Sequence, residues 1–185
     1  MTMQLNRRGF LKTTGALGAG FVVGFNTSGS LAVAAHHSAT DLNAFVRVSE
    51  DGTVTAILKH FEMGQGTTTG LTTLIAEEMD LPWGSVKTSF APSDNETYKN
   101  LAFGSQGTGG STAIANSWDQ YRVAGAGARE MLVRAAAKQW GVEPDQVRVE
   151  DGVFKTGDKT AAIADLVAEA SVLEAPAKPL SLIHI

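Results

Sequence analysis

Two glycine-rich segments, residues 62–70 and 104–113, hold the side chains best suited to binding chemistry. The first begins Glu62-Met63-Gly64-Gln65-Gly66, the second ends Gly109-Gly110-Ser111-Thr112-Ala113, and each precedes a predicted helix. A helix start offers unpaired N–H groups and a partial positive charge, and glycine lets a ligand approach the backbone closely. The amide of Gln65 can donate and accept at once, which suits the edge of a heterocycle. Two such loops in one fold could hold the two ends of a phosphate-bearing cofactor.

The glycine spacing by itself leaves two interpretations open. No Gly-Lys-Ser/Thr follows either segment, so neither is a Walker A sequence, and Gly104, Gly107 and Gly109 reverse the intervals of the G-x-G-x-x-G dinucleotide fingerprint. Glycine loops before helices also serve as simple caps. The loops are therefore either a cofactor site or ordinary helix starts.

Three stretches of the sequence favour the cofactor site. They are Glu-Met-Gly-Gln-Gly-Thr at 62–67, Leu-Ile-Ala-Glu-Glu at 74–78, and Ala-Phe-Gly-Ser-Gln-Gly-Thr-Gly-Gly-Ser-Thr at 102–112. Together they resemble the molybdopterin-binding large subunit of the molybdenum hydroxylases, the xanthine dehydrogenase and aldehyde oxidase family. The branch that is most similar contains the isoquinoline 1-oxidoreductase beta subunit and related exported aldehyde dehydrogenases. The likeness runs from Asn43 to about Ala170.

The resemblance implies a set of cofactor-binding residues. Those on the first segment would line the pterin and dithiolene of a molybdenum–molybdopterin cytosine dinucleotide cofactor, and those on the second would hold its phosphate side. The implied residues are Met63, Gly64, Gln65, Gly66, Gly109, Gly110, Ser111, Thr112 and Ala113.

The resemblance also implies the reaction, in which an aldehyde is oxidised or an N-heterocycle is hydroxylated with water as the oxygen source. Electrons then leave through [2Fe–2S] clusters. Because this chain has no cysteine, those clusters are expected on a small partner subunit. In exported members of the family a cytochrome c subunit can follow.

The family's catalytic glutamate lies near the C-terminus of the full subunit, and no counterpart occurs before Ile185. We therefore assign no catalytic residue and no metal ligand, and expect the chain alone to be inactive. Glu77 and Glu78, near the end of a predicted helix, are interpreted as a solvated face. His60, beside the first segment, is interpreted as structural.

The N-terminus predicts export. Arg7 and Arg8 precede a mildly apolar run that ends in Ala32-Val33-Ala34, which is typical of a twin-arginine signal peptide, here residues 1–35. That export machinery carries folded, cofactor-loaded proteins to the periplasm. A transmembrane anchor is the alternative, but glycine and serine dilute the run.

Composition excludes one class of partner. The net charge is -4, and it becomes about -7 without the signal, which contains Arg7, Arg8 and Lys12 and no acid. An acidic chain with no basic cluster is a poor nucleic-acid binder. The resemblance implies a small-molecule substrate.

The hydrophobic pattern predicts an α+β fold, with β-hairpins and a small mixed sheet packed against two or three helices, as part of a larger molybdopterin-binding domain. We expect a linker at 36–42, this domain at 43–170, and a truncated tail at 171–185 whose last six residues resemble a translated sequencing adapter; the alternative is a genuine apolar tail. The predicted elements are a hairpin turning at Asp51-Gly52, a helix from Leu71 to Pro82, a strand at 86–91, a loop at 92–103, a helix over 111–140, a hairpin at 147–154 and a helix over 162–170. The alanines of the longest helix predict close packing against another layer.

Two other functions stay open. An exported nicotinamide-dependent oxidoreductase is one, although the sequence lacks the fingerprint and shows no parallel β-α-β pattern. A non-catalytic periplasmic binding module, in which the glycines only cap helices, is the other.

Overall fold

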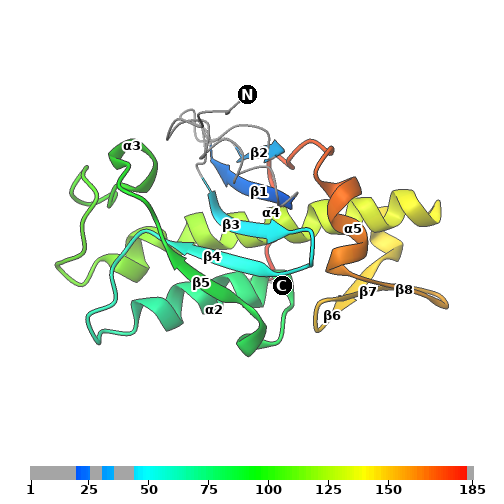
Figure 1. Cartoon of the computed structure of the whole chain (residues 1–185), viewed down its shortest axis with the longest axis horizontal. Coiled ribbons are helices and arrows are strands. Elements are labelled where there is room, and N and C mark those ends of the chain that lie inside the picture. Colours follow the sequence, from blue (N-terminus) through cyan, green and yellow to red (C-terminus); the bar gives the residue numbers. More distant parts are fainter. Residues whose placement is uncertain (1–19, 26–30, 36–43, 183–185) are drawn as a thin grey trace, which may run out of the picture.

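A computed structural model describes residues 20–25, 31–35 and 44–182 of the chain (Figure 1). Its main layer is a five-stranded sheet of order β2-β1-β3-β4-β5. The strands are β1 (Gly20–Phe25), β2 (Leu31–Ala35), β3 (Ala44–Ser49), β4 (Val54–Leu58) and β5 (Lys87–Phe90). Neighbours are antiparallel except β4 and β5, which are parallel. The sheet is therefore mixed, as predicted.

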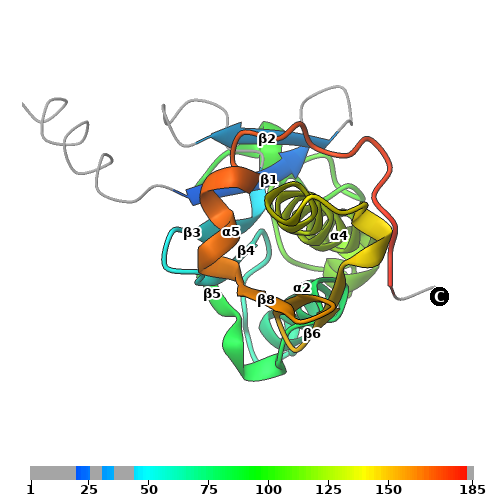
Figure 2. The same ribbon diagram turned by 90° about the vertical axis from the view of Figure 1, so that its right-hand side faces the viewer.

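Helices form the second layer. The long helix α4 (Ala113–Trp140) lies beside α2 (Thr67–Met79), and α5 (Ile163–Ala170) also packs on α4 (Figure 2). A small antiparallel sheet of β6 (Arg148–Glu150), β7 (Val153–Thr156) and β8 (Lys159–Ala162) lies near α5. Short helical turns are η1 (Trp83–Ser85), α3 (Asn95–Tyr98) and η2 (Pro144–Gln146). The predicted α+β class is confirmed.

The predicted turns form where local chemistry favours them. Asp151 and Gly152 between β6 and β7 have φ of 49° and 76°, the two positive values that a type I′ hairpin turn requires. Gly141 ends α4 in the left-handed region, and its N–H bonds back to the last carbonyls of the helix. Sequence and structure agree on the end of this helix because glycine adopts that conformation without strain.

The core lies between the sheet and the two long helices. The ring centroids of Phe45 on β3 and Tyr121 on α4 are 4.9 Å apart, and both side chains are fully buried. Leu71 and Ile75 come from α2, and Met131 and Leu132 from α4. The apolar positions of these helices face one another at helical spacing, which is what the sequence pattern predicted.

Helices α2 and α4 approach closely. A Cβ built on Gly125 of α4 would lie 2.9 Å from the Cβ of Glu78 and 3.4 Å from the Cα of Ile75, both on α2. Ala124, Ala126 and Ala128 are also fully buried. The close packing predicted from the alanine-rich sequence is confirmed.

Two features differ from the expected elements. The predicted loop 92–103 contains the short helix α3, whose start is capped by the Asp94 carboxylate accepting from the N–H groups of Glu96 and Thr97. The expectation of no parallel β-α-β unit is wrong, since β4, α2 and β5 form one with β4 and β5 parallel. Hydrophobic periodicity locates strands but not their direction, so the sequence pattern missed this crossover.

The N-terminal prediction falls partly outside the described residues. Residues 1–19, 26–30 and 36–43 are not described, whereas β1 and β2 lie within the predicted signal and β1 pairs with β3. Cleavage after Ala34 would remove β1 and nearly all of β2 from the sheet. The signal, the linker and the domain boundary at 43 stay predictions.

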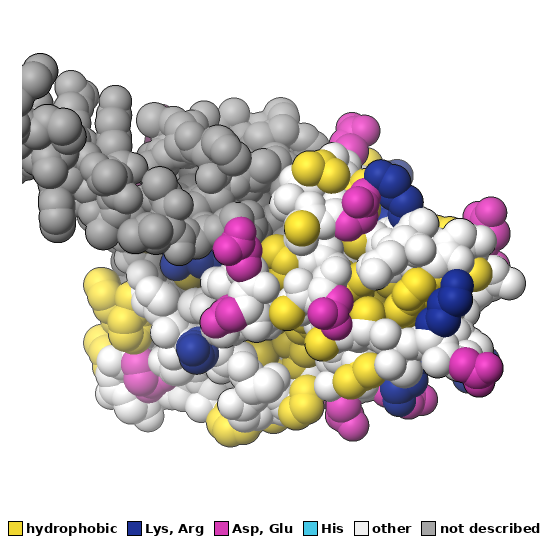
Figure 3. Space-filling view, turned by 45° about the vertical axis from the view of Figure 1, so that its right-hand side comes forward, with side chains coloured by type: hydrophobic (Ala, Val, Ile, Leu, Met, Phe, Trp, Pro, Cys, Tyr) yellow, Lys and Arg dark blue, Asp and Glu magenta, His cyan; other side chains and the backbone are white. Residues whose placement is uncertain are grey.

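Among the described residues, no helix combines the length and apolar character needed to cross a bilayer. On the face drawn in Figure 3, Lys and Arg side chains are scattered among Asp and Glu.

Candidate functional site

The two glycine-rich segments lie side by side at the carboxyl end of β4. We call residues 61–66 the first loop and residues 100–112 the second loop. The backbone N–H of Phe61 donates to Thr108 Oγ1 at 2.9 Å, which ties the loops directly. The first loop opens α2 and the second opens α4. In α/β units the carboxyl ends of parallel strands are where ligands bind, so this is the edge at which a site is expected.

Glu62 organises the first loop. Its carboxylate accepts from the N–H groups of Gly64 at 2.8 Å, Gly66 at 3.0 Å and Thr68 at 2.8 Å. These bonds, above all those from Thr68 and Gly66, hold the pKa of Glu62 below its ordinary value. The start of α2 therefore already has a carboxylate at the place where a bound anion would lie.

Gln65 is folded into the same loop. Its Oε1 accepts from the N–H of Met63 at 2.5 Å, and its Nε2 donates to the carbonyl of Phe61 at 2.7 Å and to Thr67 Oγ1 at 3.0 Å. Gly64 and Gly66 have φ of 91° and 83°, and a Cβ at either would meet nothing within 4 Å. The backbone of this loop is thus fixed by side chains and open on its outer side.

The second loop is built around the buried Asn100. Its Nδ2 donates to Thr112 Oγ1 at 2.8 Å and to the carbonyl of Gly107 at 3.4 Å, and its Oδ1 accepts from the N–H of Ala102 at 2.9 Å. The Thr112 hydroxyl in turn donates to the carbonyl of Gly109 at 2.9 Å. One buried amide therefore sets the path of the loop from 102 to 112.

The start of α4 differs from that of α2. Thr112 occupies the N-cap position but makes no side-chain bond to the first turn of the helix. Within the part of the chain that the structure describes, the N–H groups of Gly109, Gly110 and Ser111 donate to no other protein group. This leaves a run of free donors ahead of an uncapped helix start, which is a favourable place for an anion.

Two buried polar residues lie below the loops: His60, which the sequence indicated as structural, and Lys59, which sequence reasoning did not single out. His60 is 1% exposed, with Nδ1 3.1 Å from the carbonyl of Gly107 and Nε2 3.5 Å from Asn116 Nδ2. Lys59 is 3% exposed, and its Nζ donates to the carbonyl of Lys99 at 3.3 Å and to Gln120 Oε1. Burial lowers the pKa of Lys59 to about 8, and burial first and the Lys59 charge second lower the pKa of His60. The usable signal was a polar pair directly after an apolar strand and before the first loop.

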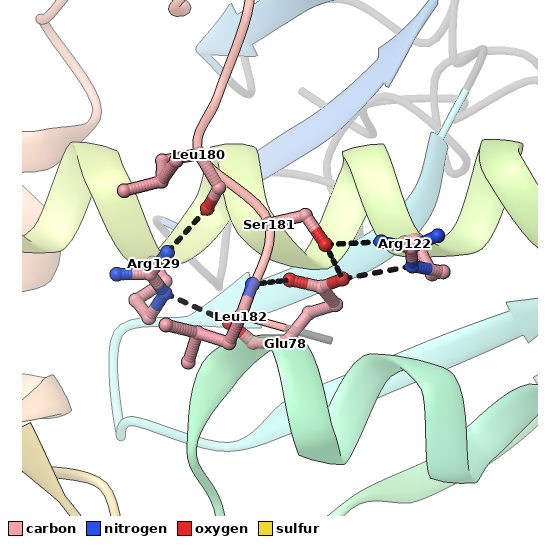
Figure 4. A network of polar contacts seen from close by, with 6 residues as sticks. All are labelled: Glu78, Arg122, Arg129, Leu180, Ser181 and Leu182. Atoms are coloured by element: carbon pink, nitrogen blue, oxygen red, sulfur yellow. Dashed lines mark hydrogen bonds and ion pairs between the residues drawn. The ribbon is translucent and has the colours of Figure 1, made fainter. Parts of the chain in front are cut away.

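The interpretation of Glu78 as a solvated residue is wrong. Its side chain is fully buried, and its carboxylate lies 3.0 Å from Arg122 Nε and accepts the N–H of Leu182 at 2.8 Å (Figure 4). Ser181 bonds to both Glu78 and Arg122. The partner on α4 lies far away in the sequence, so nothing local indicated the burial. Glu77 is exposed, as predicted.

A family model described as the molybdopterin cofactor-binding domain matches residues 3–181. The chain belongs to this family. The matched range includes the segment predicted as a signal peptide.

Three curated proteins are similar to the chain in sequence. The chain is 36% identical over 179 residues to the beta subunit of isoquinoline 1-oxidoreductase from Brevundimonas diminuta, covering 94% of this chain and 23% of that protein. It is 33% identical over 172 residues to a membrane-bound aldehyde dehydrogenase of Gluconacetobacter polyoxogenes named for pyrroloquinoline quinone, covering 89% and 21%. The B subunit of nicotinate dehydrogenase from Pseudomonas putida is 36% identical over 128 residues, covering 69% and 10%. The chain spans about a fifth of the length of the first two relatives.

Solved structures show the same fold. A reconstituted CO dehydrogenase from Oligotropha carboxidovorans superposes with a TM-score of 0.53 at 19% identity, over 80% of this chain and 18% of that one. A Cu,Mo-CO dehydrogenase in its carbon monoxide reduced state gives 0.52 at 19% identity, over 80% and 19%.

The donor set of this molybdopterin-binding domain fits a large phosphate-bearing cofactor. The second loop supplies free N–H groups and the hydroxyl of Ser111 beside the uncapped start of α4. The first loop supplies glycines with open space above them. Among the described residues, no cluster of His, Asp or Glu is suited to hold a metal ion.

Proposed function

We propose that the two loops bind the molybdenum–molybdopterin cytosine dinucleotide cofactor, in the large subunit of an exported oxidoreductase that oxidises an aldehyde or hydroxylates an N-heterocycle. The single observation that supports this most is the difference between the two helix starts. Glu62 fills the one at α2, whereas free N–H groups lead to the one at α4. The phosphate side of the cofactor is therefore assigned to the second loop, as the resemblance implied.

The roles of the residues follow from their chemistry. Gly109, Gly110 and Ser111 donate backbone N–H groups to the phosphates, and Ser111 adds a hydroxyl. Met63, Gly64, Gln65 and Gly66 form the side toward the pterin, where Gln65 exchanges its loop bonds for bonds to the ring edge. When bound, the cofactor supplies the redox chemistry at the substrate carbon with water as the oxygen source. The protein residues hold and orient the cofactor.

Apolar side chains on the loops support a bulky occupant. Phe61, Met63 and Phe103 are 60%, 69% and 50% exposed, and the ring of Phe61 contacts that of Phe90 at 5.6 Å. An exposed group of large apolar residues is typical of a ligand or interaction surface.

Partners and location extend the same proposal. We assign the [2Fe–2S] clusters that carry electrons away to a small partner subunit, as the resemblance implies, with a cytochrome c subunit as the next acceptor. The sequence itself contains no cysteine that could ligate such a cluster. The twin-arginine export machinery takes the loaded protein to the periplasm. Replacing Arg7 and Arg8 by Lys should then leave the cofactor-loaded subunit in the cytoplasm, as measured by cell fractionation.

The β4-α2-β5 unit gives the nicotinamide alternative one supporting observation, since dinucleotides bind at such crossovers. There the pyrophosphate lies on the helix start after the first strand. In this chain Glu62 fills that place with three accepted hydrogen bonds. A carboxylate there repels a pyrophosphate, so this alternative is disfavoured.

The test is cofactor analysis of the full-length large subunit, purified with its partner. Stoichiometric molybdenum, together with cytidine monophosphate released by acid hydrolysis, is the expected result. Molybdenum well below stoichiometric, or recovery of pyrroloquinoline quinone instead, contradicts the proposal.

Variants of the loops sharpen this test. Ser111→Ala removes the hydroxyl donor of the second loop and should lower the cytidine monophosphate content, whereas Thr73→Val on α2 is a control that should retain it. If the glycines only cap helices, Gln65→Ala and Ser111→Ala will leave the cofactor content and the activity of the whole subunit unchanged.

A further inference from the structure

We propose that His60 is a positioning residue that joins the two loops into one cradle, so that each loop stabilises the binding conformation of the other. The inference rests on the proposed function for its purpose, but the coupling itself is a property of the protein without cofactor.

The position of His60 suits this role. It lies between β4 and the first loop, so its backbone fixes where the first loop begins. Its side chain is 1% exposed and reaches the middle of the second loop, with Nδ1 3.1 Å from the carbonyl of Gly107 and 3.4 Å from Thr108 Oγ1. His60 is thus connected to the first loop through its backbone and to the second loop through its ring.

The partners of the ring define its protonation. The carbonyl of Gly107 can only accept, so Nδ1 must carry the hydrogen. Asn116 Nδ2, which also donates to the carbonyl of Thr112, can only donate, so Nε2 must be unprotonated. Neutral imidazole with the hydrogen on Nδ1 satisfies both sides, and a buried ring with both nitrogens bonded is held in one orientation.

A second tie runs beside the first. The N–H of Phe61 donates to Thr108 Oγ1 at 2.9 Å, so the residue after His60 bonds to the residue after Gly107. Asn100 Nδ2 also donates to the Gly107 carbonyl, at 3.4 Å. The two ties are adjacent in both loops, and loss of either leaves the other to hold the loops alone.

The consequence concerns the separation of the two binding regions. Gly64 and Gln65 follow His60 by only four and five residues, and Gly109 and Gly110 follow Gly107 by two and three. A ligand that spans both loops needs this separation fixed before it binds, since ordering the loops on binding would weaken its affinity.

The experiment measures hydrogen–deuterium exchange by peptide in the 185-residue chain produced without cofactor. His60→Leu removes the donor to Gly107, whereas His60→Asn retains one, because Asn Nδ2 takes the place of Nδ1. We expect His60→Leu to speed exchange in both 61–66 and 104–111 by roughly tenfold, as for loss of one buried hydrogen bond. His60→Asn should restore most of the protection.

A peptide distant from the loops separates coupling from general destabilisation. Phe154 on β7 is buried in the core, and its peptide should exchange at an unchanged rate in every variant. Thr108→Val, which removes the second tie, should speed exchange in the same two loop peptides, while Thr73→Val should not. The proposal is overturned if only one loop responds, if neither does, if 153–156 accelerates equally, or if Asn protects no better than Leu.

Cofactor content then relates the coupling to the proposed function. In the full-length subunit, His60→Leu should lower both molybdenum and cytidine monophosphate content, and His60→Asn should retain them. If the wild-type subunit carries no molybdenum, the proposed function fails while the exchange result still decides the coupling.

Discussion

The carboxylate of Glu78 on α2 lies 3.0 Å from Nε of Arg122 on α4, and both side chains are almost completely buried. The same carboxylate accepts the N–H of Leu182, and Arg129 donates to the Glu78 carbonyl at 2.9 Å and to the Leu180 carbonyl at 2.5 Å (Figure 4). One buried acid therefore connects the two helices that carry the loops with the chain that follows α5. The Glu78–Arg122 pair thus joins the two helices that follow the loops.

Removing one member of the buried pair should cost more than removing both. Glu78→Ala leaves the Arg122 guanidinium buried without its carboxylate and should lower the free energy of unfolding by about 3–5 kcal/mol. The double variant Glu78→Gln, Arg122→Met keeps the volume without a buried charge and should recover much of that loss. Urea denaturation of the three proteins measures it. A double variant as unstable as Glu78→Ala would contradict this account.

Gly125→Ala should destabilise the helix pair although alanine favours helices. The new Cβ would lie 2.9 Å from the Cβ of Glu78, so α2 and α4 must separate. Overpacking of this kind costs about 1–3 kcal/mol, which exceeds the helix-propensity gain of about 1 kcal/mol. Gly84→Ala is the control, because a Cβ there meets nothing within 4 Å. Thermal denaturation should show a lower Tm for Gly125→Ala alone, and equal Tm values would contradict the close approach.

Some features of the fold are determined by residues close in the sequence, and others by residues that are distant in it. The turn at Asp151-Gly152 and the end of α4 at Gly141 were predicted correctly because the deciding preference lies in those residues themselves. The burial of Glu78 was not predicted, because it depends on Arg122 and on Leu182 of a remote segment. Whether a polar residue near a helix end is solvated depends on which layer covers it, and periodicity does not report that.

The candidate site shows the same division. Spacing placed both glycine loops ahead of helices, and α2 and α4 do follow them. It also suggested that each loop could hold one end of a phosphate-bearing cofactor at its helix start, but Glu62 fills the start of α2. A motif that begins with a carboxylate and turns through two glycines can cap its own helix. The position of Glu62 before Gly64 and Gly66 could therefore have predicted this cap, but only the glycines were considered as caps.

The capping role of Glu62 predicts a pH dependence. Hydrogen bonds from Thr68, Gly66 and Gly64 lower its pKa in the folded protein below the ordinary value of 4.5. The stabilisation is therefore present above pH 4.5 and is lost as the pH falls through the lowered folded value. Glu62→Gln should be less stable than wild type at neutral pH, and the difference should shrink in acid.

Amide exchange at Gly64 and Gly66 in an acid titration, followed by NMR, measures this dependence. Glu77→Gln, an exposed position on the same helix, is the control and should match wild type throughout. A difference between Glu62→Gln and wild type that persists below the folded pKa would show that the carboxylate charge is not what caps the helix.

Buried Lys59 predicts a further rise in stability with pH, at alkaline pH. Burial lowers its pKa from 10.5 to about 8, so the folded protein releases this proton before the unfolded chain does. Between these values the unfolded chain binds more protons, and the free energy of unfolding should rise with pH. Burial also raises the pKa of Tyr121, so stability should fall once tyrosine in the unfolded chain ionises near pH 10. The effect of Lys59 can therefore be measured separately between about pH 8 and 9.5.

Lys59→Met should abolish the rise, whereas Lys138→Met, with its exposed side chain, should retain it. Urea midpoints measured across this window provide the test, and a flat wild-type profile would mean that the Lys59 ammonium is not desolvated beneath the second loop.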